Sequence, residues 1–64
     1  MEKIRIAIAD DDAGMRMMVR KLIERADDYA LVGEAENGEE LLDLFEKTRP
    51  EVVFMDVEIG RAHV

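Results

Sequence analysis

Two apolar stretches that each end in acids decide the fold: IRIAIADDD at residues 4–12 and VVFMD at residues 52–56. Each apolar part is short and rich in β-branched or aromatic residues, as expected of a strand. The second does not alternate with polar residues, which is typical of a strand covered on both faces. If the two strands lie parallel and adjacent, their carboxyl ends bring Asp10, Asp11 and Asp56 into one pocket.

The composition indicates one small domain. The chain has 64 residues, no cysteine and 48% hydrophobic residues, which is too apolar for a disordered acidic chain. Its 16 acids against 9 bases give a net charge of −7, which argues against nucleic acid as a partner. No apolar run approaches the ~20 residues of a membrane span, and no cleavable signal pattern opens the chain. We therefore expect a soluble cytoplasmic protein with no membrane partner.

A helix is predicted directly after the first strand. From Ala13 onward, apolar residues recur with helical spacing along one face, which comprises Met15, Met18, Val19, Leu22, Ile23 and Ala26. Asp11 or Asp12 can cap the start of this helix. We expect Met15, Met18 and, in the last strand, Met55 to pack in the core.

The remaining elements complete an alternating order. Residues 29–35 predict a weaker strand at a sheet edge. Asn37 predicts the N-cap of a second helix with Glu40 as its capping-box partner, and Pro50 ends that helix. Right-handed crossovers turn this β-α-β-α-β order into a parallel sheet. With one helix on each face the strand order is 2-1-3, an α/β, flavodoxin-like, doubly wound arrangement.

The acid triplet at residues 10–12 has a plainer interpretation, a turn followed by a helix N-cap, which one acid would satisfy. Three adjacent acids repel one another, a cost that a cation or a basic group must offset. Asp56 is not explained by strand packing, because strands disfavour Asp. Together these acids favour a site for a hard divalent cation over an accident of packing.

These motifs resemble the receiver domains of two-component response regulators, over about residues 3–60. The resemblance rests on residues 6–12, on Met15-Arg16, on residues 33–40 and on residues 50–56. It implies that Asp56 is the phosphoacceptor. It also implies that Asp11 and Asp56 bind Mg²⁺ directly, that Asp10 acts mostly through water, and that the backbone carbonyl of Glu58 is a further ligand.

The resemblance further implies a partner. The usual phosphoryl donor in the family is a phosphohistidine on a sensor histidine kinase or phosphotransfer protein. Arg16 and Arg20 lie near the start of the first helix and resemble the surface that docks this partner. The alternative for these arginines is an ordinary solvated helix face.

The chain also departs from the family pattern. Complete receivers continue through two more strands and three more helices, which carry a lysine and a hydroxyl residue that bind the phosphoryl group. We therefore expect residues 1–59 to be a truncated receiver, the N-terminal half only, and residues 60–64, with His63, to be an unrelated or disordered tail. Phosphorylation should be weak or absent, and efficient enzymatic activity is not expected.

Truncation predicts self-association. The last strand would become an exposed apolar edge, a template for pairing with another chain, so a homodimer could complete the sheet. This suggests a second function class, a non-catalytic, self-associating half-fold that acts as an assembly element or is an engineered fragment.

Overall fold

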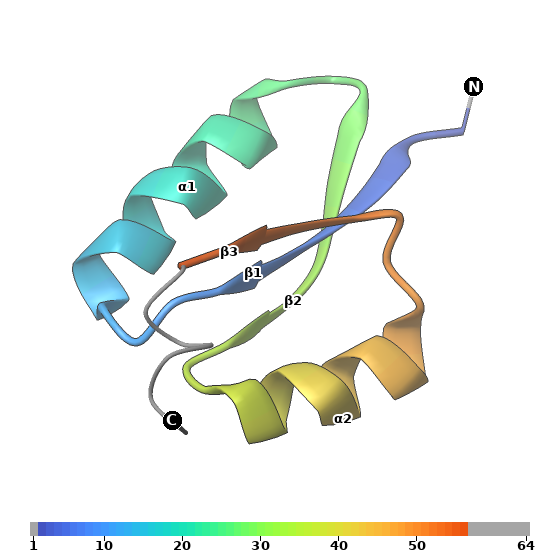
Figure 1. The fold of residues 1–64 in the computed structure, drawn as a ribbon. Coiled ribbons are helices and arrows are strands. Elements are labelled where there is room, and N and C mark those ends of the chain that lie inside the picture. The colour runs from blue at the N-terminus through green and yellow to red at the C-terminus, as the bar shows by residue number, and fades with distance from the viewer. Residues whose placement is uncertain (1, 57–64) are drawn as a thin grey trace.

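A computed structural model describes residues 2–56. These residues form a three-stranded parallel sheet with two helices (Figure 1). The elements follow the predicted order: β1 (Ile4–Ala9), α1 (Ala13–Arg25), β2 (Tyr29–Ala35), α2 (Gly38–Thr48) and β3 (Val52–Met55). The sheet order is β2-β1-β3, which confirms the predicted doubly wound arrangement. Residues 57–64 lie outside the described residues, and with them the predicted tail and His63.

The central strand β1 carries the core, because both of its faces are covered. α1 and α2 lie on opposite sides of the sheet (Figure 1). On the α1 side, Ile6 and Ile8 pack against Ile23. On the α2 side, Ala9 and Ala35 are buried against Leu41, Leu44 and Val53. Alternate residues of a strand point to opposite faces, so the large residues of β1 face α1 and its alanines face α2.

Side-chain caps fix where both helices begin. Asp12 is the N-cap of α1, and its Oδ1 accepts hydrogen bonds from the backbone N–H groups of Gly14 at 2.8 Å and Met15 at 3.4 Å. Asn37 caps α2 by accepting from the Glu40 N–H at 2.8 Å. Glu40 reaches back to the N–H of Glu36 at 3.0 Å, one residue before the N-cap, so the capping box is closed one residue earlier than predicted.

The end of α2 is fixed to the start of the sheet by an arginine. Arg49 adopts a left-handed conformation with φ 48° and ends the helix before Pro50. The guanidinium of Arg5, on β1, donates to the carbonyl of Arg49 at 2.8 Å and to the carbonyl of Thr48. A cation at a helix C-terminus satisfies free carbonyls and complements the helix dipole, so Arg5 joins the first strand to the second helix.

A bulge in β2 sets which side chains face each helix. Ile6 pairs with Leu31, but the next residue, Ala7, pairs with Gly33, so Val32 is an extra residue in the ladder. An extra residue reverses the facing of everything after it. Leu31 packs on the α1 side, whereas Gly33 and Ala35 face α2.

The predicted core role of the methionines is wrong. Met15 is 43%, Met18 53% and Met55 51% exposed. Leu22, on the same predicted helix face, is 60% exposed, and only Ile23 of α1 is buried. The reason is that β3 is an edge strand among the described residues, so no further strand of that part of the chain lies beneath the outer side of α1.

Gly33 generates a stability prediction, because β2 and α2 approach closely there. A Cβ at Gly33 would lie 2.3 Å from Leu44 Cδ1, so Gly33→Ala forces this side chain to move. We expect a loss of about 1–3 kcal/mol in the free energy of unfolding, measured by urea denaturation at fixed protein concentration.

Two further variants test the cause. In the Gly33→Ala, Leu44→Ala double variant the clash is removed, so its cost should be smaller than the sum of the two single costs. Gly14→Ala is the control, because its Cβ would meet only Asp12 Oδ1 at 3.3 Å. Additive costs in the double variant would contradict this account of the β2–α2 contact.

Candidate functional site: an acidic pocket at the strand ends

Parallel pairing of β1 with β3 brings distant acids together. Ala9 pairs with Met55, and the backbone N–H of Asp56 donates to the Ala9 carbonyl at 2.9 Å. Asp10 and Asp56 therefore follow the carboxyl ends of two adjacent strands and lie next to each other. One carboxylate oxygen from each of Asp10, Asp11 and Asp56 lies within 4.8 Å of the others.

The three acids of the triplet have different positions and roles. Asp12 caps α1 and is not in the cluster. Asp10 is half-buried; its N–H continues the sheet by donating to Ala35, and its Oδ1 accepts from the N–H of Asp12 at 2.9 Å. Asp11 is exposed beside it. The turn interpretation therefore holds for Asp12, and Asp10 serves both the turn and the cluster.

The donor set fits a hard divalent cation. Oxygens around Mg²⁺ lie about 2.1 Å from the ion, so adjacent ligands are about 3 Å apart and opposite ones about 4.2 Å apart. The cluster spans up to 4.8 Å. Small side-chain rotations, or a water between Asp10 and the ion, would close the remaining gap.

An open pocket of about 530 Å³ lies over this cluster. Its acidic end is formed by residues 10–12 and Asp56, and its flank is apolar, with Met15, Phe54 and Met55. The pocket therefore combines carboxylates and apolar side chains in one open lining.

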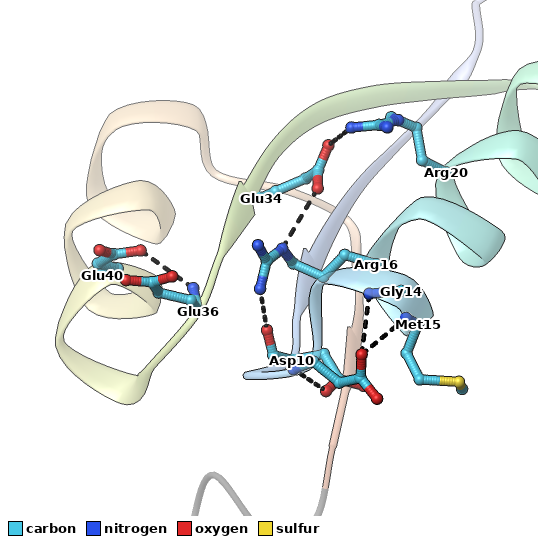
Figure 2. Close-up of polar contacts among 9 residues, drawn as sticks. Asp10, Gly14, Met15, Arg16, Arg20, Glu34, Glu36 and Glu40 are labelled. Carbon is cyan, nitrogen blue, oxygen red and sulfur yellow. Dashed lines mark hydrogen bonds and ion pairs between the residues drawn. The ribbon is translucent and has the colours of Figure 1, made fainter.

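Both predicted docking arginines are engaged within the chain. Arg16 Nη1 donates to the backbone carbonyl of Asp10 at 2.6 Å, and its Nε lies 3.5 Å from Glu34 Oε1. Arg20 Nη1 lies 3.0 Å from Glu34 Oε2. Figure 2 shows Glu34 between the two arginines, with Arg16 reaching on to Asp10. Side-chain exposure is 18% for Arg16 and 38% for Arg20, so Arg20 is the more accessible of the pair.

The structure thus brings Asp10, Asp11 and Asp56 together and places Arg16 beside them. The predicted backbone ligand at Glu58 lies outside the described residues. Sequence reasoning missed Glu34. Two arginines four residues apart on a helix could have suggested a shared carboxylate partner, but only the bulge in β2 identifies which acid faces them.

The sequence profile of the response regulator receiver domain matches residues 6–63. The chain belongs to this family, the receiver domains of two-component systems.

The chain is 41% identical over 56 residues, 88% of its length, to a protein-glutamate methylesterase/protein-glutamine glutaminase of Methanococcoides burtonii. It is 42% identical over 53 residues, 83% of its length, to Protein CcdB of Bacillus subtilis. It is 38% identical over 60 residues, 94% of its length, to the uncharacterized transcriptional regulatory protein YxjL of the same organism. No solved structure matches the chain.

The matches cover only part of each relative. The chain spans 16% of the methylesterase, 43% of Protein CcdB and 28% of YxjL. What is shared with the methylesterase is a receiver domain, which is a regulatory module. Within residues 2–56, neither helix has the length and apolarity needed to cross a membrane.

The acid cluster generates a prediction about like-charge repulsion. Asp56→Asn removes one of three carboxylates that lie within 4.8 Å of one another. In EDTA and low salt we expect this variant to gain on the order of 1 kcal/mol in the free energy of unfolding, with the gain shrinking as salt is added. Urea denaturation with circular dichroism measures it.

Asp12→Asn is the matched control, because it changes a neighbouring acid outside the cluster and keeps a good N-cap residue. It should change stability less than Asp56→Asn does. A less stable Asp56→Asn protein in EDTA would contradict repulsion as the dominant interaction among these carboxylates.

Proposed function

We propose that this chain is a phosphoacceptor module, in which Asp56 accepts a phosphoryl group with Mg²⁺ held by Asp10, Asp11 and Asp56. The observation that supports this most is the convergence of three carboxylate oxygens within 4.8 Å at the carboxyl edge of β1 and β3. This edge is where ligands bind in doubly wound sheets.

The proposed reaction needs little from the protein beyond positioning. A carboxylate oxygen of Asp56 attacks phosphorus in line, the bond from phosphorus to the donor's leaving group breaks, and an acyl phosphate forms. When bound, Mg²⁺ supplies charge neutralisation for the equatorial phosphoryl oxygens. Asp10, Asp11 and Asp56 would hold the ion, and the pairing of Ala9 with Met55 keeps Asp56 at the same end of the sheet as the other two acids.

The proposed donor is a phosphohistidine on a sensor histidine kinase or phosphotransfer protein. The first turns of α1 border the pocket, since Met15 and Val19 line it together with the acids. These apolar side chains form a surface on which such a partner could place its histidine next to Asp56, while Arg20 lies on the β2 side of α1 against Glu34. Arg16 is less available for docking, because its guanidinium is bound to Asp10 and Glu34.

Incubation with acetyl phosphate and Mg²⁺ followed by intact mass spectrometry tests the phosphoacceptor assignment. We expect slow addition of one phosphoryl group that is lost in Asp56→Asn and in EDTA. Asp12→Asn should still be modified, because Asp12 caps α1 and lies outside the cluster. An adduct on any residue other than Asp56, or one that persists in Asp56→Asn, would contradict the assignment.

A second function, self-association, is favoured by the apolar surface around β3. Val52 is 40%, Phe54 48% and Met55 51% exposed. Apolar residues of α1 and α2 flank the strand on opposite faces, among them Leu22 at 60% and Phe45 at 41% exposed. An exposed apolar edge strand is a template for pairing with another strand, and we propose that a second copy pairs there.

Charge favours one arrangement of that homodimer. Every strand of the sheet runs in the same direction, so parallel pairing of β3 with its copy would place the two acidic clusters side by side. Antiparallel pairing about a two-fold axis perpendicular to the sheet separates them. It also places the two copies of α1 on one face and the two copies of α2 on the other.

Sedimentation velocity at micromolar concentration tests this. We expect a dimer that Phe54→Lys converts to monomer, with a loss of stability because the edge is no longer covered. Met17→Lys is the control, because Met17 is 47% exposed on α1 but lines none of the pockets beside β3. A folded, cooperatively melting monomer of the unmodified chain would rule out self-association.

A further inference from the structure

The Arg16 side chain connects Asp10, in the acidic pocket, to Glu34 on β2. Its guanidinium donates to the Asp10 carbonyl at 2.6 Å and pairs with Glu34 at 3.5 Å (Figure 2). It is 18% exposed. A planar guanidinium with several fixed donors can hold two acceptors at once, which a lysine ammonium on a flexible stem does poorly.

The bonded carbonyl belongs to the peptide group between two of the clustered acids. The Asp10 carbonyl and the Asp11 N–H lie in one rigid plane, so a hydrogen bond to this oxygen orients the backbone from which both carboxylates project. Asp10 is held from the other side by its N–H bond to Ala35. Sheet pairing fixes only the N–H of Asp10. The hydrogen bond from Arg16 to the Asp10 carbonyl therefore fixes the orientation of the following Asp10–Asp11 peptide group.

Glu34 decides what the arginine contributes. Its carboxylate is 24% exposed and contacts both Arg16 and Arg20, so one negative charge offsets part of the positive charge of the two arginines. The positive charge that is left would repel a divalent ion. We expect the hydrogen bond from Arg16 to the Asp10 carbonyl to outweigh this repulsion.

From this geometry we propose that Arg16 is a positioning residue for the cation site: it orients the Asp10–Asp11 peptide, and Glu34 both holds it in place and offsets part of its charge. The inference rests on the proposed function, because it concerns Mg²⁺ binding by these acids. It predicts that removing Arg16 weakens Mg²⁺ binding, whereas charge repulsion alone would predict tighter binding. If Arg16 acted only as a nearby positive charge, its removal would tighten Mg²⁺ binding.

The first test is a Mg²⁺ titration of the ¹⁵N-labelled chain, followed by amide chemical shifts. We expect Arg16→Met and Arg16→Lys each to weaken binding about 10-fold, as is typical for loss of a group that orients metal ligands. Arg20→Lys is the matched control, because Arg20 contacts Glu34 but not Asp10, and its affinity should stay within about two-fold. Tighter binding by Arg16→Met would overturn the inference.

The second test needs no metal. In EDTA, the ¹⁵N order parameter of the Asp11 amide reports the mobility of the same peptide plane. It should fall from a rigid value of about 0.85 toward 0.6 in Arg16→Lys and stay high in Arg20→Lys. An unchanged Asp11 order parameter would reject Arg16 as a positioning residue.

The two tests separate the possible failures. An unmodified chain that shows no saturable Mg²⁺ binding would contradict the proposed cation site, while the order parameter would still decide whether Arg16 orients the peptide. Normal binding by the unmodified chain with unchanged affinity in Arg16→Lys would contradict the inference alone.

Discussion

The parallel pairing of β1 with β3 determines both the position of the acids and the arrangement of the helices. It joins residues more than forty positions apart in sequence, Ala9 with Met55, and so aligns two acid-terminated strands at one sheet edge. The same pairing makes β1 central, which forces α1 and α2 onto opposite faces and leaves the switch point between β1 and β3 open above the acids. The interior consists mainly of β1, whose Ile6, Ala7, Ile8 and Ala9 are buried, together with Ile23 of α1 and Ala35 of β2. A small core of this kind stabilises a short chain only modestly. Because β1 is central, β3 lies at an edge of the described sheet and its apolar side chains are exposed.

The starts of both helices and the ends of β1, α2 and β3 could be predicted because each is marked by local chemistry. Asp12 and Asn37 accept the first free N–H groups of their helices, Pro50 stops the second, and acids end β1 and β3. The relative positions of Asp10, Asp11 and Asp56 followed from the order of strands alone. The features that local chemistry does not encode were missed. The extra residue at Val32 is a property of the pairing between two strands, and the partners of Arg16 and Arg20 depend on it. The exposure of Met15 and Met18 was missed because helical spacing identifies an apolar face but does not reveal whether another element covers it.

The neighbouring acids around the pocket make different polar contacts and have different roles. Asp12 caps the helix, Asp10 belongs to both the turn and the acid cluster, and Glu34 contacts Arg16 and Arg20 of α1. Asp12 and Glu34 lie outside the cluster and have their own hydrogen-bond donors, so a cation would offset the repulsion among Asp10, Asp11 and Asp56. Membership of the receiver family agrees with this pocket, and the division of roles comes from the contacts of this chain.

Paramagnetic broadening with Mn²⁺ at substoichiometric concentration shows whether one divalent ion is shared by the ends of β1 and β3. We expect the amide signals of residues 10–12 and of Met55 and Asp56 to broaden first and excess Mg²⁺ to restore them. Asp27 and Asp28 are equally negative but lie at the opposite end of β1, where the Asp28 carbonyl accepts from the N–H of Ile4, so their amides should stay sharp. Broadening at Asp27 and Asp28 as strong as at Asp10 and Asp56, or broadening at the end of only one of the two strands, would contradict the shared site.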